Sequence, residues 1–538
     1  MAELSYAGGI PEPGLSPRAQ RSIFIASFMT LIAVGIGFAI RAGVLGDWGV
    51  QYGFTKSELG QIAGAGLAGF GFTIIFFSFF ADTVGYRALL LLAFALLLIS
   101  EVVTMMAGPI YHSQGQKAAY WTLYSGTFIF SLAQGLCEAA INPLTATLYP
   151  KNKTHYLNIL HAGWPGGLMI GGVICYLFTG QQPAITHVRW EILASVYLIP
   201  TLYFGFVTLR EKFPISEAKA AGVSLGQMIM AVFAPMLIFL FIIHAMIGYV
   251  ELGTDSWIQN ILNNTLKSRA SLLFTYCSII MIILRFCAGP IVHKINPLGL
   301  LFIAACCGAT GLYFLGYPST GAIIWVAATV FAIGKSFYWP TMLGVIGERF
   351  PKGGALAMGL SGGIGMLSAG FLGGPGIGYT YDRNASANLV QTDDAAYNRV
   401  KSADANQFAF FKPVQGLDSQ KLAVIDDAGA QLTSDLQKKP DDKSLLALDH
   451  WFNTVEKPHL ESDKAPVDAA NIFGGRRALQ ITACVPATMA ACYLLLVLYF
   501  LARGGYKAIH LDSSGRQIEV DLTSGEAEAM EAGTTQQA

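Results

Sequence analysis

A series of long apolar runs limits what this chain can fold into more than any other feature. A helix that crosses a bilayer needs roughly 20 mainly apolar residues. The sequence contains twelve such runs, at 22–46, 57–81, 87–108, 119–148, 155–180, 190–210, 225–262, 268–293, 297–317, 320–348, 353–380 and 476–502. They predict an all-α, polytopic membrane protein with twelve transmembrane helices. Some runs exceed the bilayer thickness, so we expect those helices to tilt or project.

The composition agrees with a membrane environment and gives no sign of other chemistry. Hydrophobic residues make up 53% of the chain and charged residues 13%, about half the charged share usual for soluble proteins. Basic and acidic residues balance at 34 each, which does not suggest nucleic-acid binding. The eight cysteines lie inside apolar segments with no spacing suited to zinc. With no nucleophile–base set either, we expect no metal, no cofactor and no enzyme activity.

The basic residues between the runs indicate which side each loop faces. An even number of runs puts both termini on one side, and the loops there carry more Lys and Arg than the short loops opposite. This positive-inside pattern predicts cytoplasmic termini in the cytoplasmic (inner or plasma) membrane. The polar start and the long first run favour a retained helix over a cleaved signal. The predicted segments are a cytoplasmic tail (1–21), a six-helix half (22–210), a cytoplasmic linker (211–224), helices seven to eleven (225–380), an extracytoplasmic insertion (381–475), helix twelve (476–503) and a cytoplasmic tail (504–538).

Two segments about 200 residues apart share the same order of features. Residues 135–172 and 334–374 each contain a proline within an apolar run, then a Pro–Lys turn, then a glycine-rich run. Small residues let transmembrane helices approach closely. The repeat predicts two pseudo-symmetric six-helix halves. In membrane proteins built this way, a solute site lies between the halves near the middle of the bilayer.

The loops after runs two and eight also correspond. The first reads "FADTVGYR" (80–87), with Asp82 and Arg87, and the second reads "RFCAGPIVHKI" (285–295), with Arg285 and Lys294. They resemble the short loop motif of the major facilitator superfamily, in which an acid and a base brace neighbouring helices at the cytoplasmic mouth. The resemblance implies a gating role for these four residues. The alternative is a basic turn that only follows the topology rule.

Ionisable side chains within apolar runs are costly in a bilayer and therefore indicate function. In a transporter of two six-helix halves, helices one, four, seven and ten line the pathway. The charged residues on those runs are Arg41, Glu138, Glu251, Asp255 and Lys335. Further polar and aromatic candidates are Asn142, His161, Trp164, Trp257 and Trp339. Structural alternatives stay open: a buried pair for Glu138, solvation for Glu251 and Asp255, and packing for His161.

One string resembles a specific family. Residues 135–167, "GLCEAAINPLTATLYPKNKTHYLNILHAGWPGG", resemble the helix-four-to-five signature of the fucose–proton symporter family. The matching positions are Glu138, Asn142, Pro143, Leu157, Asn158 and His161. In "GYVELGTDSW" (248–257), Tyr249, Val250, Glu251 and Trp257 match a second run of that family. The resemblance implies proton-coupled sugar uptake by alternating access, with Glu138 in solute and proton coupling.

Two departures from the family keep another solute class open. Carriers of this family have an acid in helix one, where this chain has an apolar residue near Val44 and Arg41 one turn away. The chain also adds Lys335, and two pathway cations suit an organic anion such as a uronate or another carboxylate. A third hypothesis is a membrane receptor or enzyme whose helices scaffold the outer insertion. The expected partners are a small-molecule solute, protons and the lipid bilayer.

The position of Arg41 leads to one structural prediction. An arginine in a spanning helix needs a partner or a ligand. We predict that the partner is Glu138, on another pathway helix of the same half. Glu101, on the third run, is expected to snorkel or to brace helices. The insertion between 388 and 461 lacks candidate pathway residues and is predicted to be dispensable for transport.

Overall fold

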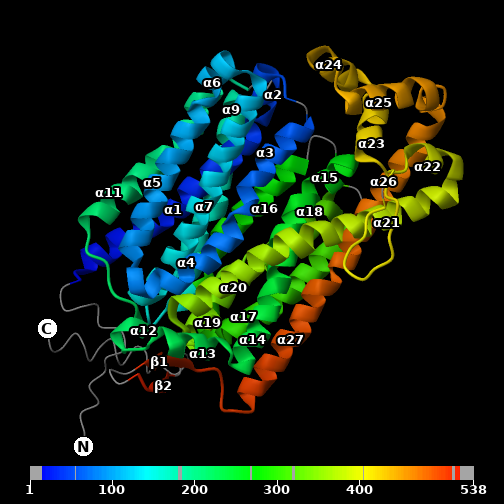
Figure 1. Cartoon of the computed structure of the whole chain (residues 1–538). Coiled ribbons are helices and arrows are strands. Elements are labelled where there is room, and N and C mark those ends of the chain that lie inside the picture. The colour runs from blue at the N-terminus through cyan, green and yellow to red at the C-terminus, as the bar shows by residue number, and fades with distance from the viewer. Residues whose placement is uncertain are drawn as a thin grey trace, which may run out of the picture.

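The protein is a bundle of long helices with a smaller helical lobe at one end (Figure 1). The computed structural model describes residues 15–54, 56–179, 184–266, 270–317, 321–403, 405–511 and 515–520. The start of the first helix and the two strands near the C-terminus lie at the end of the bundle opposite the lobe. We call that end the termini face and the other end the lobe face.

The first half of the bundle, the N-half, comprises eleven α-helices and one short 3-10 helix. Several are consecutive pieces of one membrane-length segment, separated by a kink. They are α1 (Pro17–Gly43), α2 (Leu45–Tyr52), α3 (Lys56–Ala68), α4 (Phe70–Val84), α5 (Tyr86–Met105), α6 (Ala107–Gln114), α7 (Gln116–Leu148), α8 (Lys153–His161), α9 (Gly163–Phe178), α10 (Trp190–Ala194), η1 (Ser195–Tyr197) and α11 (Leu198–Arg210).

The second half, the C-half, follows a linker that contains a short helix. The linker helix is α12 (Glu217–Ala220). The helices of the C-half are α13 (Leu225–Val232), α14 (Pro235–Gly248), η2 (Tyr249–Gly253), α15 (Thr254–Leu266), α16 (Ala270–Phe286), α17 (Ala288–Leu315), α18 (Ala322–Lys335), α19 (Tyr338–Arg349), η4 (Pro351–Gly353), α20 (Gly354–Ser368), η5 (Ala369–Gly373), α21 (Gly374–Thr392), α26 (Leu460–Thr482) and α27 (Cys484–Leu501).

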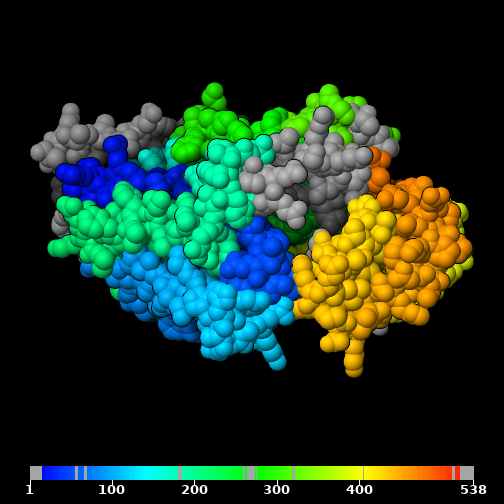
Figure 2. All heavy atoms as spheres, turned by 90° about the horizontal axis from the view of Figure 1, so that it is seen from above, coloured from blue at the N-terminus to red at the C-terminus, as the bar shows by residue number. Residues whose placement is uncertain are grey.

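The lobe lies between α21 and α26, beside the N-half when the molecule is viewed from the lobe face (Figure 2). Its elements are α22 (Asp394–Val400), α23 (Ser419–Asp426), α24 (Ala430–Lys438), α25 (Lys443–Trp451) and η6 (Phe452–Glu456). After α27 the described residues include an antiparallel pair of strands, β1 (Ala508–Leu511) and β2 (Gln517–Val520), at the termini face.

The membrane character of the fold is confirmed. Ten helical segments of the described residues are long and apolar enough to cross a bilayer. Two further predicted spans correspond to α7, which has 33 residues, and to α16, which contains the shorter apolar helix Thr275–Phe286. Twelve transmembrane helices therefore remain a prediction, in which α7 and α16 would be added to the ten segments.

Several helix boundaries differ from the predicted runs, each for a local reason. Predicted run seven started at 225, but Pro235 begins a new helix because its ring cannot continue the α13 ladder. The turn after run eight falls at Asn296, whose φ is 55°, so the helical segment continues to 295. The predicted insertion (381–475) begins inside α21 and ends inside α26, because these helices pack on each other beyond the apolar segments. Gly474 allows that packing, since a Cβ there would meet the backbone of Tyr381.

Glycines also allow neighbouring helices to approach closely, as the glycine-rich runs predicted. A Cβ on Gly359 of α20 would collide with Ser78 of α4, and one on Gly363 would collide with Ile75. In the N-half, Gly167 of α9 lies directly against the backbone of α1. Such close backbone approach stabilises helix pairs where no hydrophobic effect acts between them.

Candidate functional site

In the N-half, three of the predicted site residues form one hydrogen-bonded chain. Asn142 donates through Nδ2 to Glu138 Oε2 at 2.7 Å, one turn earlier on α7. His161 of α8 lies 2.9 Å from Asn142 Oδ1 through Nε2. An amide oxygen only accepts hydrogen bonds, so His161 Nε2 carries the proton in this contact. All three side chains are buried, and His161 Nε2 is 4.0 Å from the carboxylate of Glu138.

In the C-half, Arg285 of α16 is the hub of a second buried group. Its guanidinium donates through Nε to the carbonyl of Ser336 at 2.7 Å and through Nη1 to the carbonyl of His161 at 2.7 Å. Nη2 donates to Glu251 Oε1 at 3.1 Å. Because His161 belongs to the N-half, Arg285 links the two halves inside the bundle.

Prolines explain why these two carbonyls are available. In an α-helix the carbonyl of residue i accepts from the N–H of residue i+4, and proline has no N–H. Pro165 therefore leaves the carbonyl of His161 without its helical donor, and Pro340 does the same to Ser336. The helices break near both carbonyls, between α8 and α9 and between α18 and α19. Arg285 supplies the missing donors.

Two further charged residues of the C-half lie near this hub. Lys335, at the end of α18, donates to both oxygens of Asp255, at 2.6 and 2.9 Å. Glu251 lies in the π-helical turn η2, where Gly253 packs against Gly373 of a second π-helical turn, η5. Single π-turns inside helices frequently mark functional sites. The predicted residues Glu251, Asp255 and Lys335 thus lie together around Arg285.

The predicted tryptophans have different surroundings. Trp339 of α19 is buried with its ring edge-on to His244, at a centroid distance of 4.7 Å. His244 in turn shares a 2.7 Å hydrogen bond with Ser361 through Nδ1. Trp257 donates to the carbonyl of Gly374 at the join of η5 and α21. Trp164 is half-buried beside Phe38, in the N-half.

The predicted pair of Arg41 with Glu138 is wrong. Arg41 forms its ion pair with Glu101 of α5, at 3.5 Å, and donates to Ser100 at 3.1 Å. Its guanidinium lies over the rings of Phe130 and Tyr197, at 4.1 and 5.0 Å. This side of α1 faces the other helices of the N-half, so Arg41 joins helices within that half. Glu101 braces helices, as the sequence indicated.

Arg285 is also not a loop residue, contrary to the prediction. The turn of that segment is at Asn296, eleven residues later, which is about 16 Å along a helix. The predicted loop residue Lys294 is near the turn and exposed. In the first loop, Asp82 accepts from the backbone N–H of Ala355 at the start of α20, at 3.0 Å. Arg87 donates to the carbonyls of Thr208 and Leu209 at the end of α11.

At the termini face, hydrogen bonds join the halves directly. Lys153 of α8 donates to the carbonyl of Gly347 at 3.1 Å, and Thr154 donates through Oγ1 to Glu348 Oε1 at 2.5 Å. Deeper in the bundle, Asn158 donates to Thr341 at 3.1 Å. These contacts close the space between α8 and α19 at this face.

The described part of the chain shows no group of three metal-ligating side chains. What it does show is buried, internally paired polar groups between two helical halves, closed at one face by contacts between the halves. This arrangement is the one expected of a membrane transporter built from two related halves.

Comparison with known proteins identifies the family. The sequence profile of the Major Facilitator Superfamily matches residues 23–374, so the chain belongs to that superfamily. No curated protein sequence matches it.

Among solved structures, the proton:xylose symporter XylE is similar with 16% identity and a TM-score of 0.55, over 66% of this chain and 88% of that chain. The transporter FucP, in an outward conformation, has 16% identity and a TM-score of 0.52, over 67% and 93%. The human organic anion transporter MFSD10 has 13% identity and a TM-score of 0.50, over 67% and 92%. At these identities the similarity shows the fold.

Proposed function

We propose that this protein is a secondary active transporter that moves a small neutral polar solute, most simply a sugar, by alternating access coupled to proton movement. The pathway lies between the halves, around Glu138, His161, Arg285 and Glu251. XylE, one of the proteins with a similar fold, is a proton:xylose symporter, which makes sugars the first class to test.

The proposal of a neutral solute rests on the ion pairs that the buried cations already form. Arg41, Arg285 and Lys335 are each within 3.5 Å of a carboxylate of the chain itself. An anionic solute would have to displace one of these carboxylates, and leaving a buried charge unpaired is strongly unfavourable. A neutral solute needs no such exchange. Two buried polar atoms, His244 Nε2 and Glu251 Oε2, have no hydrogen-bond partner among the described residues and could bind solute hydroxyl groups.

Glu138 is the group best suited to carry the proton. Its carboxylate is buried and accepts its hydrogen bond from a neutral amide, that of Asn142. Among the described residues its one ion-pair contact is the His161 imidazole, at 4.0 Å. A buried carboxylate without a close cation is costly while it is ionised. Proton uptake and release at Glu138 would therefore change the balance of charge in the pathway.

Thermal stabilisation of the solubilised protein tests the solute class. A ligand that binds the folded state raises the melting temperature according to its concentration relative to Kd. We expect neutral sugars to stabilise the protein and uronates or other carboxylates to leave it unchanged. Stabilisation by carboxylates alone, lost in Lys335→Gln, would instead favour an organic-anion carrier.

A further inference from the structure

The C-terminal segment folds back against the termini face of the bundle. By C-terminal segment we mean residues 503–511 and 515–520, which contain β1 and β2. All four residues of β1 are buried. Figure 1 shows the two strands below the ends of α19 and the linker helix α12. The segment is therefore packed against the C-half and the linker at this face.

The C-terminal segment binds the C-half through the end of α19. Tyr506 donates through its hydroxyl to Glu348 Oε2 at 2.8 Å. The next residue of α19, Arg349, donates through Nη1 to the carbonyl of Lys507 at 2.6 Å. The other oxygen of Glu348, Oε1, accepts from Thr154 of the N-half at 2.5 Å. One carboxylate thus joins the tail, the C-half and the N-half.

The C-terminal segment binds the linker in the same manner, through Glu217. The backbone N–H of Leu511 donates to Glu217 Oε1 at 3.1 Å, and Lys153 of the N-half donates to Oε2 at 2.7 Å. Burial acts to raise the pKa of Glu217, but the ammonium of Lys153 outweighs it, so the pKa lies below its ordinary value. Burial and Lys153 lower the pKa of the neighbouring His510 to about 4.

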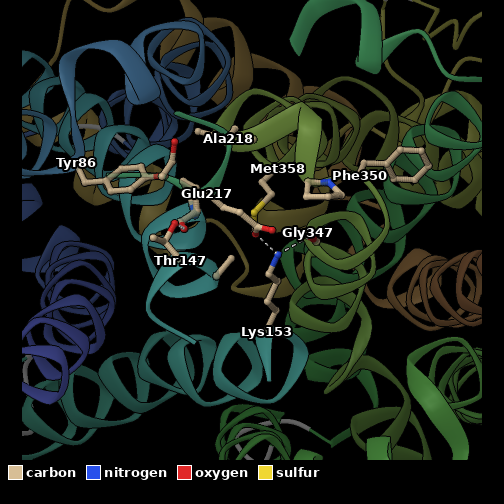
Figure 3. A pocket seen from close by; sticks show the side chains of 14 residues that line it. Tyr86, Thr147, Lys153, Glu217, Ala218, Gly347, Phe350 and Met358 are labelled. Carbon is tan, nitrogen blue, oxygen red and sulfur yellow. Dashed lines mark hydrogen bonds and ion pairs between the residues drawn. The ribbon is translucent and has the colours of Figure 1, made fainter. Parts of the chain in front are cut away.

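Lys153 is the point at which these contacts meet. Its ammonium lies between Glu217 and the carbonyl of Gly347, at the wall of a small cavity (Figure 3). Tyr86 and Met358 also line this cavity, whose free space of ≈ 30 Å³ is enough for about two water molecules. Because Lys153 and Thr154 belong to the N-half and Gly347 and Glu348 to the C-half, these bonds must break before the pathway opens at this face.

We propose that the C-terminal segment is a latch that holds the pathway closed at the termini face. Tyr506 and the N–H of Leu511 each fix one oxygen of a carboxylate, so the other oxygen is in place for Thr154 or Lys153. When the segment is removed, Glu348 and Glu217 lose this positioning and the contacts between the halves weaken. This inference does not depend on the solute, only on a pathway that opens at one face at a time.

A spin-label distance across the termini face tests the latch. Labels at Val84 of the N-half and Lys294 of the C-half, both exposed, report the separation of the halves in a background whose eight cysteines are replaced. We expect a variant ending at Gly505 to show a larger population with a long distance. Tyr506→Phe, which removes one hydrogen bond to a carboxylate, should raise the open-to-closed ratio about tenfold.

Two matched controls isolate the latch. A variant ending at Val520 keeps every described contact of the segment and should behave as the full chain. Tyr499→Phe, a partly exposed tyrosine of α27, should also leave the distances unchanged. If the Gly505 truncation and Tyr506→Phe both match the full chain, the segment does not hold the face closed. The measurement needs no solute, so it stands even if the proposed sugar transport fails.

Discussion

Replacing Arg285 by glutamine is expected to destabilise the folded protein strongly. The change removes the cation 3.1 Å from Glu251 and the donors to the carbonyls of His161 and Ser336. Arg285 and Glu251 are both buried, so little water is present to compensate. The loss therefore combines an unpaired carboxylate with two carbonyls that their prolines have already deprived of helical donors.

The size of the effect follows from these contacts. Breaking one side of a buried ion pair costs about 3–5 kcal/mol, and a buried acceptor left unsatisfied costs about 1–3 kcal/mol. These terms overlap, so we expect a loss of about 5 kcal/mol for Arg285→Gln. Adding Glu251→Gln removes the unpaired charge and should recover about 3 kcal/mol.

Melting of the solubilised variants measures the effect, and a proline substitution sharpens the test. Pro165→Ala restores an N–H that could donate to the carbonyl of His161, so it should partly rescue Arg285→Gln. Pro466→Ala, a proline inside α26, is the matched control and should not rescue it. If neither Glu251→Gln nor Pro165→Ala raises the melting temperature of the Arg285→Gln variant, the contacts of Arg285 do not contribute the stabilisation assigned to them.

Three further outcomes are expected. Arg41→Gln should destabilise the protein by about 3–5 kcal/mol, and the double change with Glu101→Gln should recover most of that in melting experiments; recovery with Glu138→Gln instead would contradict the observed pairing. Burial raises the pKa of Glu456 from 4.5 to about 7, so the lobe should lose stability as the pH rises through that interval. Glu456→Gln should remove this pH-dependent loss of stability. Hydrogen exchange of the lobe's backbone amides measures it, after correction for the intrinsic pH dependence of exchange. Replacing 388–461 by a Gly/Ser linker removes the ion pair between Lys439 and Glu58. A partly exposed pair contributes about 0–1 kcal/mol, so uptake should stay within about fivefold, whereas abolished uptake in an inserted protein would make the lobe a gate.

The helical membrane fold was predictable because long apolar runs have few alternatives in water or in lipid. The chain of Glu138, Asn142 and His161 was also within reach, since two of its members lie one helical turn apart and the third follows the intervening turn. Asp255 and Lys335 were identified as pathway candidates, although their pairing depends on how α15 and α18 pack.

Two features of the site were not predicted from the sequence: the position of Arg285 inside the bundle and the partner of Arg41. Arg285 was taken for a loop residue because "RFCAGPIVHKI" was matched to the loop motif, although Arg285 lies inside the apolar run 268–293 and Asn296–Pro297 is a turn signal that could have moved the loop. The prolines at 165 and 340 were visible as well, but which donor would serve their freed carbonyls depends on tertiary packing. Arg41 faces the interior of the N-half, and a single sequence does not give the rotation of α1 that decides this.

Proton movement driven by a solute gradient tests the central claim most directly. Proteoliposomes holding the wild-type chain should acidify when a stabilising sugar enters, and a proton gradient should drive accumulation of that sugar. Glu138→Gln should lose both while it still exchanges solute across the membrane, and Glu461→Gln, at an exposed acid of α26, should behave as the wild type. Accumulation and acidification that persist unchanged in Glu138→Gln would contradict the assignment of the proton to Glu138.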